Sequence, residues 1–288
     1  ASTGCCWGER IEQTSAYAAA RLRPSDAVSV ILGSRVSSWK ETAWNDRSGS
    51  KISTTVKDES GVITPYAGLV VDLNDNLSAY ASYTSIFEVQ SAEDTAGQRL
   101  DPLTGNNHEI GLKGSFNGGK LNATLALFRI QQDNFAVAIP DAPLNPNGVA
   151  PSRAEDGTVS KGIELEVAGE VLPGWQLGGG YAYAKPKDAA GAQLLTHVPK
   201  DTLKVFSTYR FPGEWQGLTV GGSLRWQGKS FQTGSGPNGE DFVQNALVTV
   251  DLMARYAMTK NVTVALNINN LFDKTYYSGF SWNHGIYA

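Results

Sequence analysis

Apolar and polar residues alternate one by one through most of this chain. Residues 163–167 (Ile-Glu-Leu-Glu-Val) and 121–125 (Leu-Asn-Ala-Thr-Leu) show the pattern most clearly. Alternation with a period of two places the two kinds of side chain on opposite faces of a β-strand. The pattern therefore predicts an all-β protein whose strands each have one apolar and one polar face.

Twelve such segments follow one another, joined alternately by a short turn and a long polar loop. The short turns are rich in Gly, Pro, Asn and Asp, as in Asn117-Gly118-Gly119 and Pro173-Gly174. The predicted strands are residues 10–23, 28–39, 62–73, 77–87, 109–116, 121–139, 158–172, 175–185, 202–211, 218–230, 245–258 and 262–277, and the predicted long loops are residues 41–60, 88–107, 140–157, 186–200 and 231–244. Short turns at one end and long loops at the other are typical of an antiparallel transmembrane β-barrel.

The two faces of the predicted strands differ in kind. The apolar faces carry aromatic residues near the strand ends, which resembles an interfacial girdle; they are Trp175, Tyr181, Tyr183, Tyr209, Phe211, Trp226 and Tyr256. The opposite faces carry charges, which indicates a wet lumen; they are Glu164, Glu166, Glu170, Lys204, Arg210, Arg225, Asp251 and Arg255. A soluble β-sandwich or soluble barrel is the alternative. It would not tolerate a continuous belt of exposed apolar side chains.

Composition narrows the class of protein further. The mean hydropathy is −0.25 and no apolar run is long enough for a transmembrane helix, whereas a barrel strand needs only about 9–11 alternating residues. A net charge of −4 argues against nucleic-acid binding. The three histidines (His108, His197 and His284) are scattered and the two cysteines (Cys5 and Cys6) are adjacent, so neither a metal site nor a catalytic triad is predicted.

Two further groups of residues are predicted to be structural parts of the barrel wall. Glu164 and Glu166 share a face because of strand alternation, which predicts lumen lining rather than acid–base catalysis. Gly178-Gly179-Gly180 lies within a predicted strand and is followed by no helix, so a phosphate loop is not expected there. Close packing against another part of the protein is the expected reason for these glycines.

Four stretches resemble TonB-dependent outer-membrane siderophore receptors. They are residues 64–87, 100–114, 160–166 and 267–277, and the resemblance extends over residues 10–288, leaving residues 1–9 unassigned. It implies a bacterial outer-membrane barrel filled by a plug domain, of which this chain would hold about twelve of an expected twenty-two strands. The parity of turns and loops places both chain ends outside the cell. A partial barrel is therefore expected, lacking the plug domain and the last strand.

The resemblance also implies a function. Such receptors take up ferric siderophores with energy delivered by TonB through the plug domain, and they are surrounded by outer-membrane lipid. The iron arrives already chelated, so no cofactor, metal ligand or catalytic residue is expected from the protein. A plug-free porin or channel is the alternative, and a membrane-bound hydrolase barrel would need a Ser/His/Asp grouping that the sequence lacks.

Contacts to the chelate are expected where polar strand faces meet the long loops. Aromatic and cationic side chains suit a bulky, anionic, often aromatic chelate. The candidates are Trp39, Trp44, Phe87, Phe231, Tyr277, Trp282, Arg35 and Arg225. Packing within the girdle or within a loop is the alternative role for each aromatic residue.

Overall fold

The structure, a computed structural model, is almost wholly β-sheet. It describes residues 6–47, 50–139, 142–234, 238–277, 279–281 and 285–287. The twelve main strands are β1 (Cys6–Ser25), β2 (Val28–Arg47), β3 (Ser50–Asn74), β4 (Leu77–Glu88), β5 (Leu103–Phe116), β6 (Leu121–Asp133), β9 (Thr158–Leu172), β10 (Trp175–Lys187), β11 (Asp201–Arg210), β12 (Leu218–Gln227), β15 (Leu247–Ala257) and β16 (Thr263–Ile268). They are hydrogen-bonded in that order, so strands adjacent in the sheet follow one another along the chain.

Short elements complete the fold. Three small hairpins pair β7 (Phe135–Ala138) with β8 (Ser152–Glu155), β13 (Ser230–Gln232) with β14 (Phe242–Gln244), and β17 (Gly279–Ser281) with β18 (Gly285–Tyr287), and one 3-10 helix, η1, spans Gly213–Trp215. Within the described residues, no helix has the length and apolar character needed to cross a membrane.

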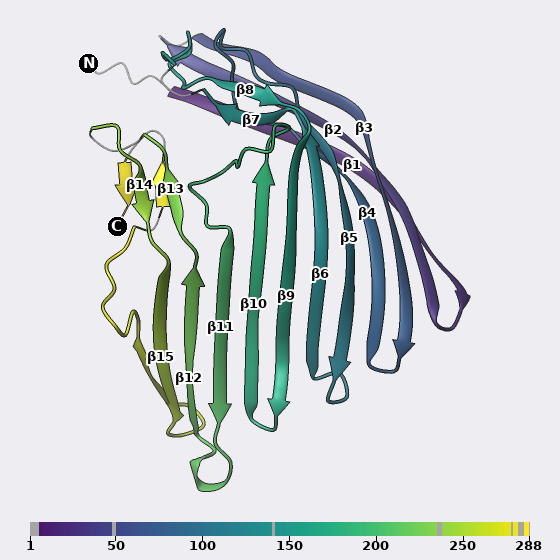
Figure 1. Cartoon of the computed structure of the whole chain (residues 1–288), viewed down its shortest axis with the longest axis vertical. Helices are drawn as coiled ribbons and strands as arrows, with labels where there is room; N and C mark the ends of the chain where they lie inside the picture. The colour runs from purple at the N-terminus through teal and green to yellow at the C-terminus, as the bar shows by residue number, and fades with distance from the viewer. Residues whose placement is uncertain are drawn as a thin grey trace. The chain divides into compact units, whose positions relative to one another are not determined.

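The chain divides into two compact units. The first comprises Ala1–Val71, Ala81–His108 and Ile130–Val159, and the second comprises Asp72–Tyr80, Glu109–Arg129 and Ser160–Ala288. The first unit therefore holds β1, β2 and most of β3 together with the β7–β8 hairpin. The second unit holds β10, β11, β12 and β15, which lie side by side (Figure 1).

In the second unit, strands β10, β11, β12 and β15 pair residue for residue without a bulge. The pairing places Gly180, Lys204 and Arg225 in one row across the sheet. Residues at the alternate positions form rows on the opposite face; one row is Tyr181, Leu203, Trp226 and Val248. The predicted separation of charged and apolar faces is confirmed here.

The apolar face of the second unit is exposed over many strands. Its exposed large side chains include Ile110, Leu112, Leu125, Leu127, Leu165, Val220, Val248, Leu252, Tyr256, Val264 and Leu266. Water seldom tolerates such a continuous belt, whereas lipid accepts it. The belt therefore favours the membrane wall over the soluble alternative.

The predicted turn Asn117-Gly118-Gly119 is present and is fixed by side-chain hydrogen bonds. All three residues have positive φ angles, which explains the two glycines and the asparagine. The Asn117 amide donates to the carbonyls of Glu170 and Val171, each at 3.0 Å. The turn between β5 and β6 is thereby attached to β9.

In the first unit, the prediction of a loop over residues 41–60 is wrong, because β2 continues to Arg47 and β3 begins at Ser50. Pairing extends as far as Arg47 with Ser50, and it shifts between Ser37 and Trp39 and again between Glu41 and Thr42. Backbone hydrogen bonds form whatever the side chains are. Beyond the membrane both faces of a strand meet water, so the sequence there need not alternate.

Two other predicted strands end early. β6 stops at Asp133 because Asn134 has a φ of 59°, and the chain then forms β7, which pairs with β8 inside the expected loop 140–157. β16 stops at Ile268 instead of residue 277. There Asn270 has a φ of 49°, and its side-chain amide group makes two 3.0 Å hydrogen bonds with the Lys274 backbone in place of ladder bonds.

Candidate functional site

Three of the expected chelate contacts come together in the first unit. Arg35 and Phe87 line a cavity of about 710 Å³ together with Tyr17 and Tyr66. Arg35, Phe87 and Trp39 line an adjoining cavity of about 260 Å³. We call Arg35, Trp39 and Phe87 the outer cluster.

The register of β1, β2 and β3 explains the shape of the outer cluster. Arg35 pairs with Tyr17 on one side and with Thr64 on the other, so all three share one sheet face. The Arg35 guanidinium donates to Ser15 Oγ at 2.8 Å, which holds the cation at the cavity wall. A Cβ atom at Gly33 would fall 2.2 Å from the Tyr66 ring, so only glycine lets this ring lie flat across β2.

A buried ion pair fixes the loop between β4 and β5 above this region. The Arg99 guanidinium donates two hydrogen bonds to the Glu41 carboxylate, at 2.6 and 3.1 Å, and Glu41 is only 1% exposed. Two side-chain amides, those of Asn145 and Asn147, donate to Glu93 Oε2 at 2.8 and 2.9 Å. The loops at 89–102 and 142–151 are therefore bound to each other and to β2. No local pattern in the sequence indicates these links.

Burial raises the pKa of Glu41 above its ordinary value, and the neighbouring Glu9 raises it further, while Arg99 acts in the opposite direction. Glu41 lies thirteen residues after the start of β2, which corresponds to about 43 Å along a strand. At a tilt of about 45° that is roughly 30 Å in height, above the apolar band of about 25 Å. Glu41 therefore titrates outside the membrane.

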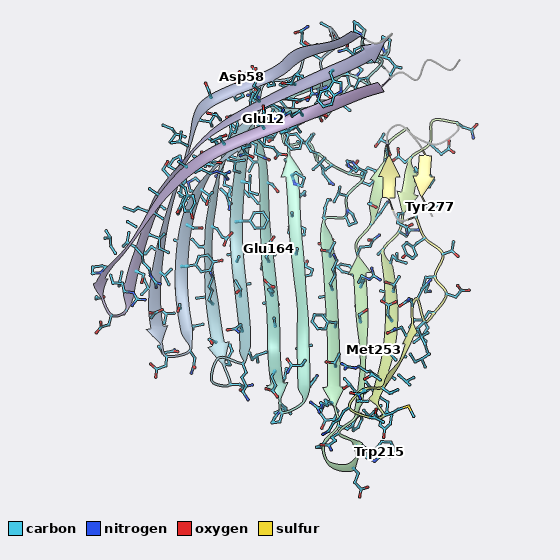
Figure 2. All side chains as sticks on the ribbon, turned by 180° about the vertical axis from the view of Figure 1, so that it is seen from behind. Glu12, Asp58, Glu164, Trp215, Met253 and Tyr277 are labelled. Atoms are coloured by element: carbon cyan, nitrogen blue, oxygen red, sulfur yellow. The ribbon has the colours of Figure 1, made fainter. Side chains whose placement is uncertain are left out.

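A second pair of expected contacts meets in the second unit. Arg225 and Tyr277 line a cavity of about 280 Å³ together with Lys204. The Tyr277 ring packs edge-on against Phe242 of β14 with 4.8 Å between centroids. Its backbone N–H donates to Gln244 Oε1 at 3.0 Å, which places Tyr277 beside the β13–β14 hairpin (Figure 2). Phe242 and Gln244 were not predicted, because only the fold brings them to residue 277.

Phe231 does not line any of these cavities. Its backbone N–H donates to the Thr196 carbonyl at 2.8 Å, and the Lys229 ammonium lies 5.8 Å from its ring centroid. Phe231 thus belongs to the β13–β14 hairpin and its neighbouring loop.

Trp44, another candidate contact, is apart from the outer cluster. Trp44 occupies the alternate position of β2 relative to Arg35 and Trp39, so it faces the other side of the sheet, and its ring lies against Gly8 of β1. Trp282 lies outside the described residues.

The chemistry of the three cavities suits an anionic solute with flat apolar groups. Each cavity combines an arginine with aromatic rings and hydroxyl groups. Over the described part of the chain, no three His, Cys, Asp or Glu side chains are grouped to hold a metal ion.

Strands with one apolar face and one charged face, joined by short turns, define the wall of a transmembrane β-barrel. The chain belongs to the TonB dependent receptor-like β-barrel family, whose model matches residues 3–271. Barrels of this family lie in the outer membrane of bacteria, so the predicted family and location are confirmed.

The relatives are similar over nearly the whole chain. A ferric-pyoverdine 358 receptor of Pseudomonas putida is 40% identical over 276 residues, which cover 96% of this chain and 34% of the relative. The ferripyoverdine receptor of Pseudomonas aeruginosa is 40% identical over 283 residues, covering 95% and 33%. The chain thus spans about a third of the length of these relatives. They are receptors, which agrees with the expectation that the chain is not an enzyme.

Solved structures show the same architecture. The crystal structure of the Pseudomonas aeruginosa ferripyoverdine receptor bound to ferripyoverdine has a TM-score of 0.79 at 38% identity, covering 93% of this chain and 36% of that one. The alcaligin outer-membrane receptor of Bordetella pertussis has a TM-score of 0.69 at 38% identity, covering 92% and 43%.

Proposed function

We propose that this chain forms part of the wall and part of the ligand site of an outer-membrane receptor that takes up ferric siderophores of the pyoverdine class. The meeting of Arg35, Trp39 and Phe87 around adjoining cavities is the observation that carries the proposal. The names of the most similar relatives supply the chelate class.

The outer cluster supplies the interactions that an anionic aromatic chelate needs. The Arg35 guanidinium, held by Ser15, attracts the negative charge around the iron. Trp39 and Phe87 offer apolar ring surface that excludes water from the contact. The iron stays coordinated by the siderophore throughout, so the protein contributes no metal ligand and needs no cofactor.

In this proposal, transport of the bound chelate requires energy. TonB would act on a plug domain in the complete receptor, and that movement would release the chelate into the lumen. The strands of this chain would contribute the fixed wall along which the chelate passes. Arg225 and Tyr277 would contribute further contacts in the second unit.

The test uses the receptor expressed from its complete gene in a strain that lacks other pyoverdine receptors. Radio-iron-loaded ferripyoverdine is followed in two assays, binding to de-energised cells and uptake by energised cells. Uptake should stop when TonB is deleted. Equal uptake with and without TonB would instead identify a plug-free channel.

Two substitutions then test the outer cluster. Arg35→Gln and Trp39→Ala should each weaken binding about tenfold, which corresponds to about 1.4 kcal/mol. Arg21→Gln and Trp175→Ala are matched controls, because Arg21 bonds to Ser29 and Trp175 bonds to Ser207, both outside the two cavities. Affinities equal to the controls for both variants would remove the outer cluster from the site.

A further inference from the structure

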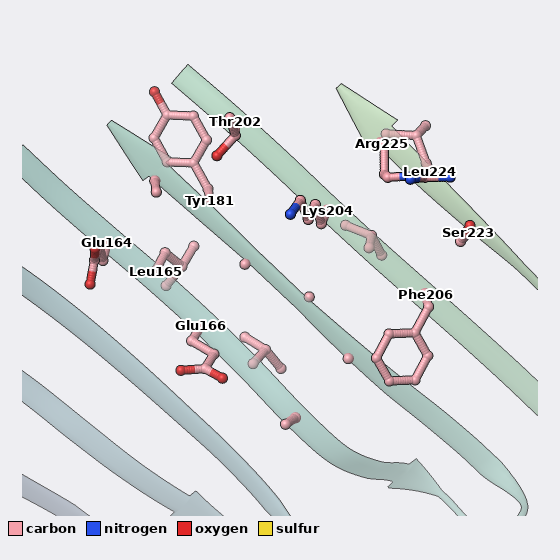
Figure 3. Close-up of a pocket in the computed structure, with 17 residues that line it drawn as sticks. Glu164, Leu165, Glu166, Tyr181, Thr202, Lys204, Phe206, Ser223, Leu224 and Arg225 are labelled. Atoms are coloured by element: carbon pink, nitrogen blue, oxygen red, sulfur yellow. The ribbon is translucent and has the colours of Figure 1, made fainter. Parts of the chain in front are cut away.

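A ring packed against a glycine occurs in both units of the sheet. In the second unit, Phe206 lies against Gly178 at a cavity of about 560 Å³, which Glu166 and Lys204 also line (Figure 3). A Cβ atom at Gly178 would fall 2.2 Å from the Phe206 ring, so the close packing expected of this glycine run is confirmed at Gly178. The first unit uses the same packing at Gly33. This packing is therefore common to both units and does not distinguish the outer cluster.

The outer cluster is distinguished by a loop that begins at its edge. Phe87 and Glu88 end β4, and the loop over residues 89–102 follows. Phe87, Glu88 and Val89 line the 260 Å³ cavity together with Trp39. The first residue of the loop is thus part of the cavity wall, so the position of the loop affects the shape of the cavity.

The far end of the same loop is bonded to β2 beside the outer cluster. β1 pairs with β2 without a shift over this stretch, so alternate residues of β2 share one face. Glu41 therefore lies on the face of Trp39, two positions further along the strand. Arg99 donates two hydrogen bonds to the Glu41 carboxylate, at 2.6 and 3.1 Å. Both partners, and the residues that bury Glu41 to 1% exposure, belong to this chain.

Two further bonds connect the ends of the loop to each other and to β3. Lys57 pairs with Glu41 across the two strands, and its ammonium lies 3.4 Å from the Asp101 carboxylate. The Gln90 side-chain amide donates to the Asp101 carbonyl at 2.5 Å. Gln90 is the second residue of the loop, so the anchored end is connected directly to the end that lines the cavity.

The middle of the loop is closed by its own hydrogen bonds. The Asp94 carboxylate accepts the backbone N–H groups of Ala96 and Gln98, at 2.9 and 2.8 Å. The Leu100 N–H donates to the Ala92 carbonyl at 2.9 Å. A segment whose polar groups are satisfied in this way is rigid. Moving its anchored end would therefore also move the end beside the cavity.

We propose that Arg99 is a positioning residue for capture of the chelate. Its bonds to Glu41 hold the loop over residues 89–102, and the loop holds Trp39 and Phe87 in place before the chelate arrives. The proposal rests on the proposed function. Contacts that are already ordered bind more tightly, because binding no longer has to immobilise them. Arg99 itself does not touch the chelate.

The test measures binding of radio-iron-loaded ferripyoverdine to de-energised cells that carry the complete receptor. Arg99→Gln should weaken binding about tenfold, as Trp39→Ala should. The double variant Arg99→Gln/Trp39→Ala should also lose only about tenfold, because both changes affect the same contacts, whereas two independent effects would multiply to about a hundredfold. Arg99→Lys keeps the charge and a donor, and its affinity should return to within about threefold of wild type.

Uptake distinguishes a positioning role from general damage to the receptor. At saturating ferripyoverdine, energised cells with Arg99→Gln should take up iron within about twofold of the wild-type rate, since only capture is affected. Gln90→Leu is a second variant that leaves no charge buried without its partner. It should weaken binding about threefold and should likewise be non-additive with Trp39→Ala.

Arg153→Ala is the matched control, because Arg153 pairs with Glu155 and lines neither cavity of the outer cluster. Affinities equal to the control for both Arg99→Gln and Gln90→Leu overturn the positioning role. A loss of about a hundredfold in the double variant also overturns it, because the loop would then act apart from Trp39. The amount of folded receptor at the cell surface is measured for every variant, and Gln90→Leu decides if Arg99→Gln does not reach the surface.

Failure of the proposed function gives a different result. A wild-type receptor that neither binds ferripyoverdine nor takes it up with TonB would refute that function. Control affinity for Trp39→Ala, with TonB-dependent uptake intact, would leave the function standing and would remove both the outer cluster and the positioning role.

Discussion

The outer end of the first unit and the charged wall of the second unit use ionic side chains in opposite ways. In the first unit, Glu41 is 1% exposed and is bonded twice by Arg99. In the second unit, Glu166 and Lys204 are exposed and make no ion pair with each other, although they face the same cavity. A buried pair is costly to break because the remaining charge is stranded without solvent, whereas exposed charges contribute little to stability. The Glu41–Arg99 pair therefore holds loops in place, whereas Glu166 and Lys204 contribute little to stability.

The largest effect is expected when the buried pair is broken. Arg99→Ala leaves the Glu41 carboxylate buried without its partner, a change that costs about 3–5 kcal/mol in comparable cases. Amide hydrogen exchange of residues 89–102 should accelerate strongly in the folded receptor. Arg153→Ala is the control, because its pair with Glu155 is half exposed and should contribute no more than about 1 kcal/mol. Equal exchange in the two variants would mean that the Glu41 pair does not hold the loop.

An intermediate effect is expected from pH. The pKa of Glu41 is raised in the folded state, so its contribution to stability is present in acid and is lost as the pH rises through that raised pKa. The free energy of opening the β2–β3 region, measured by hydrogen exchange, should therefore decline as the pH rises above about 4.5, the ordinary glutamate value. Glu41→Gln stays neutral and should flatten this decline. Parallel pH profiles for wild type and variant would contradict the assignment.

The smallest effect is expected in the second unit. Glu166→Gln removes an exposed charge that has no ion-pair partner among the described residues. The free energy of unfolding should change by less than about 0.5 kcal/mol. Thermal denaturation of the purified receptor in detergent measures it. A loss comparable to that of Arg99→Ala would show that the lumen wall also uses its charges for stability, and the contrast between the two regions would disappear.

Sequence reasoning succeeded wherever lipid imposes a pattern. The strands of the second unit were predicted because one face must be apolar. Their turns were predicted from Asn and Gly residues, and Asn117 and Gly174 do adopt the positive φ angles that such residues allow. The loop predicted for residues 41–60 is wrong, because these residues lie beyond the lipid band, where no alternation is required. Sequence reasoning also failed after Ile268, where the Asn270 side chain competes with the ladder for backbone hydrogen bonds.

The candidate contacts were predicted from residue type and position, but which of them lie together in space was not. Arg35, Trp39 and Phe87 meet through the pairing of β2 with β3 and the position of β4, and two bulges alter that pairing. Glu41 and Arg99 are fifty-eight positions apart in the sequence, so no local pattern indicates that they form a pair. Trp44 shows the same limit. It lies an odd number of positions after Trp39 along β2, so its side chain faces the other side of the sheet.

The extension of β2 and β3 has a consequence for how the receptor meets proteases. Residues 41–60 are polar and contain lysines, and a trypsin-like enzyme would cleave such a segment readily if it were a loop. A protease must first draw its substrate into an extended, unpaired form. Within this segment β2 already has a hydrogen-bonded neighbour on each side, β1 and β3, so its backbone has no free edge to offer. The β2 part of a stretch with the composition of a vulnerable surface loop is thereby closed to such an enzyme.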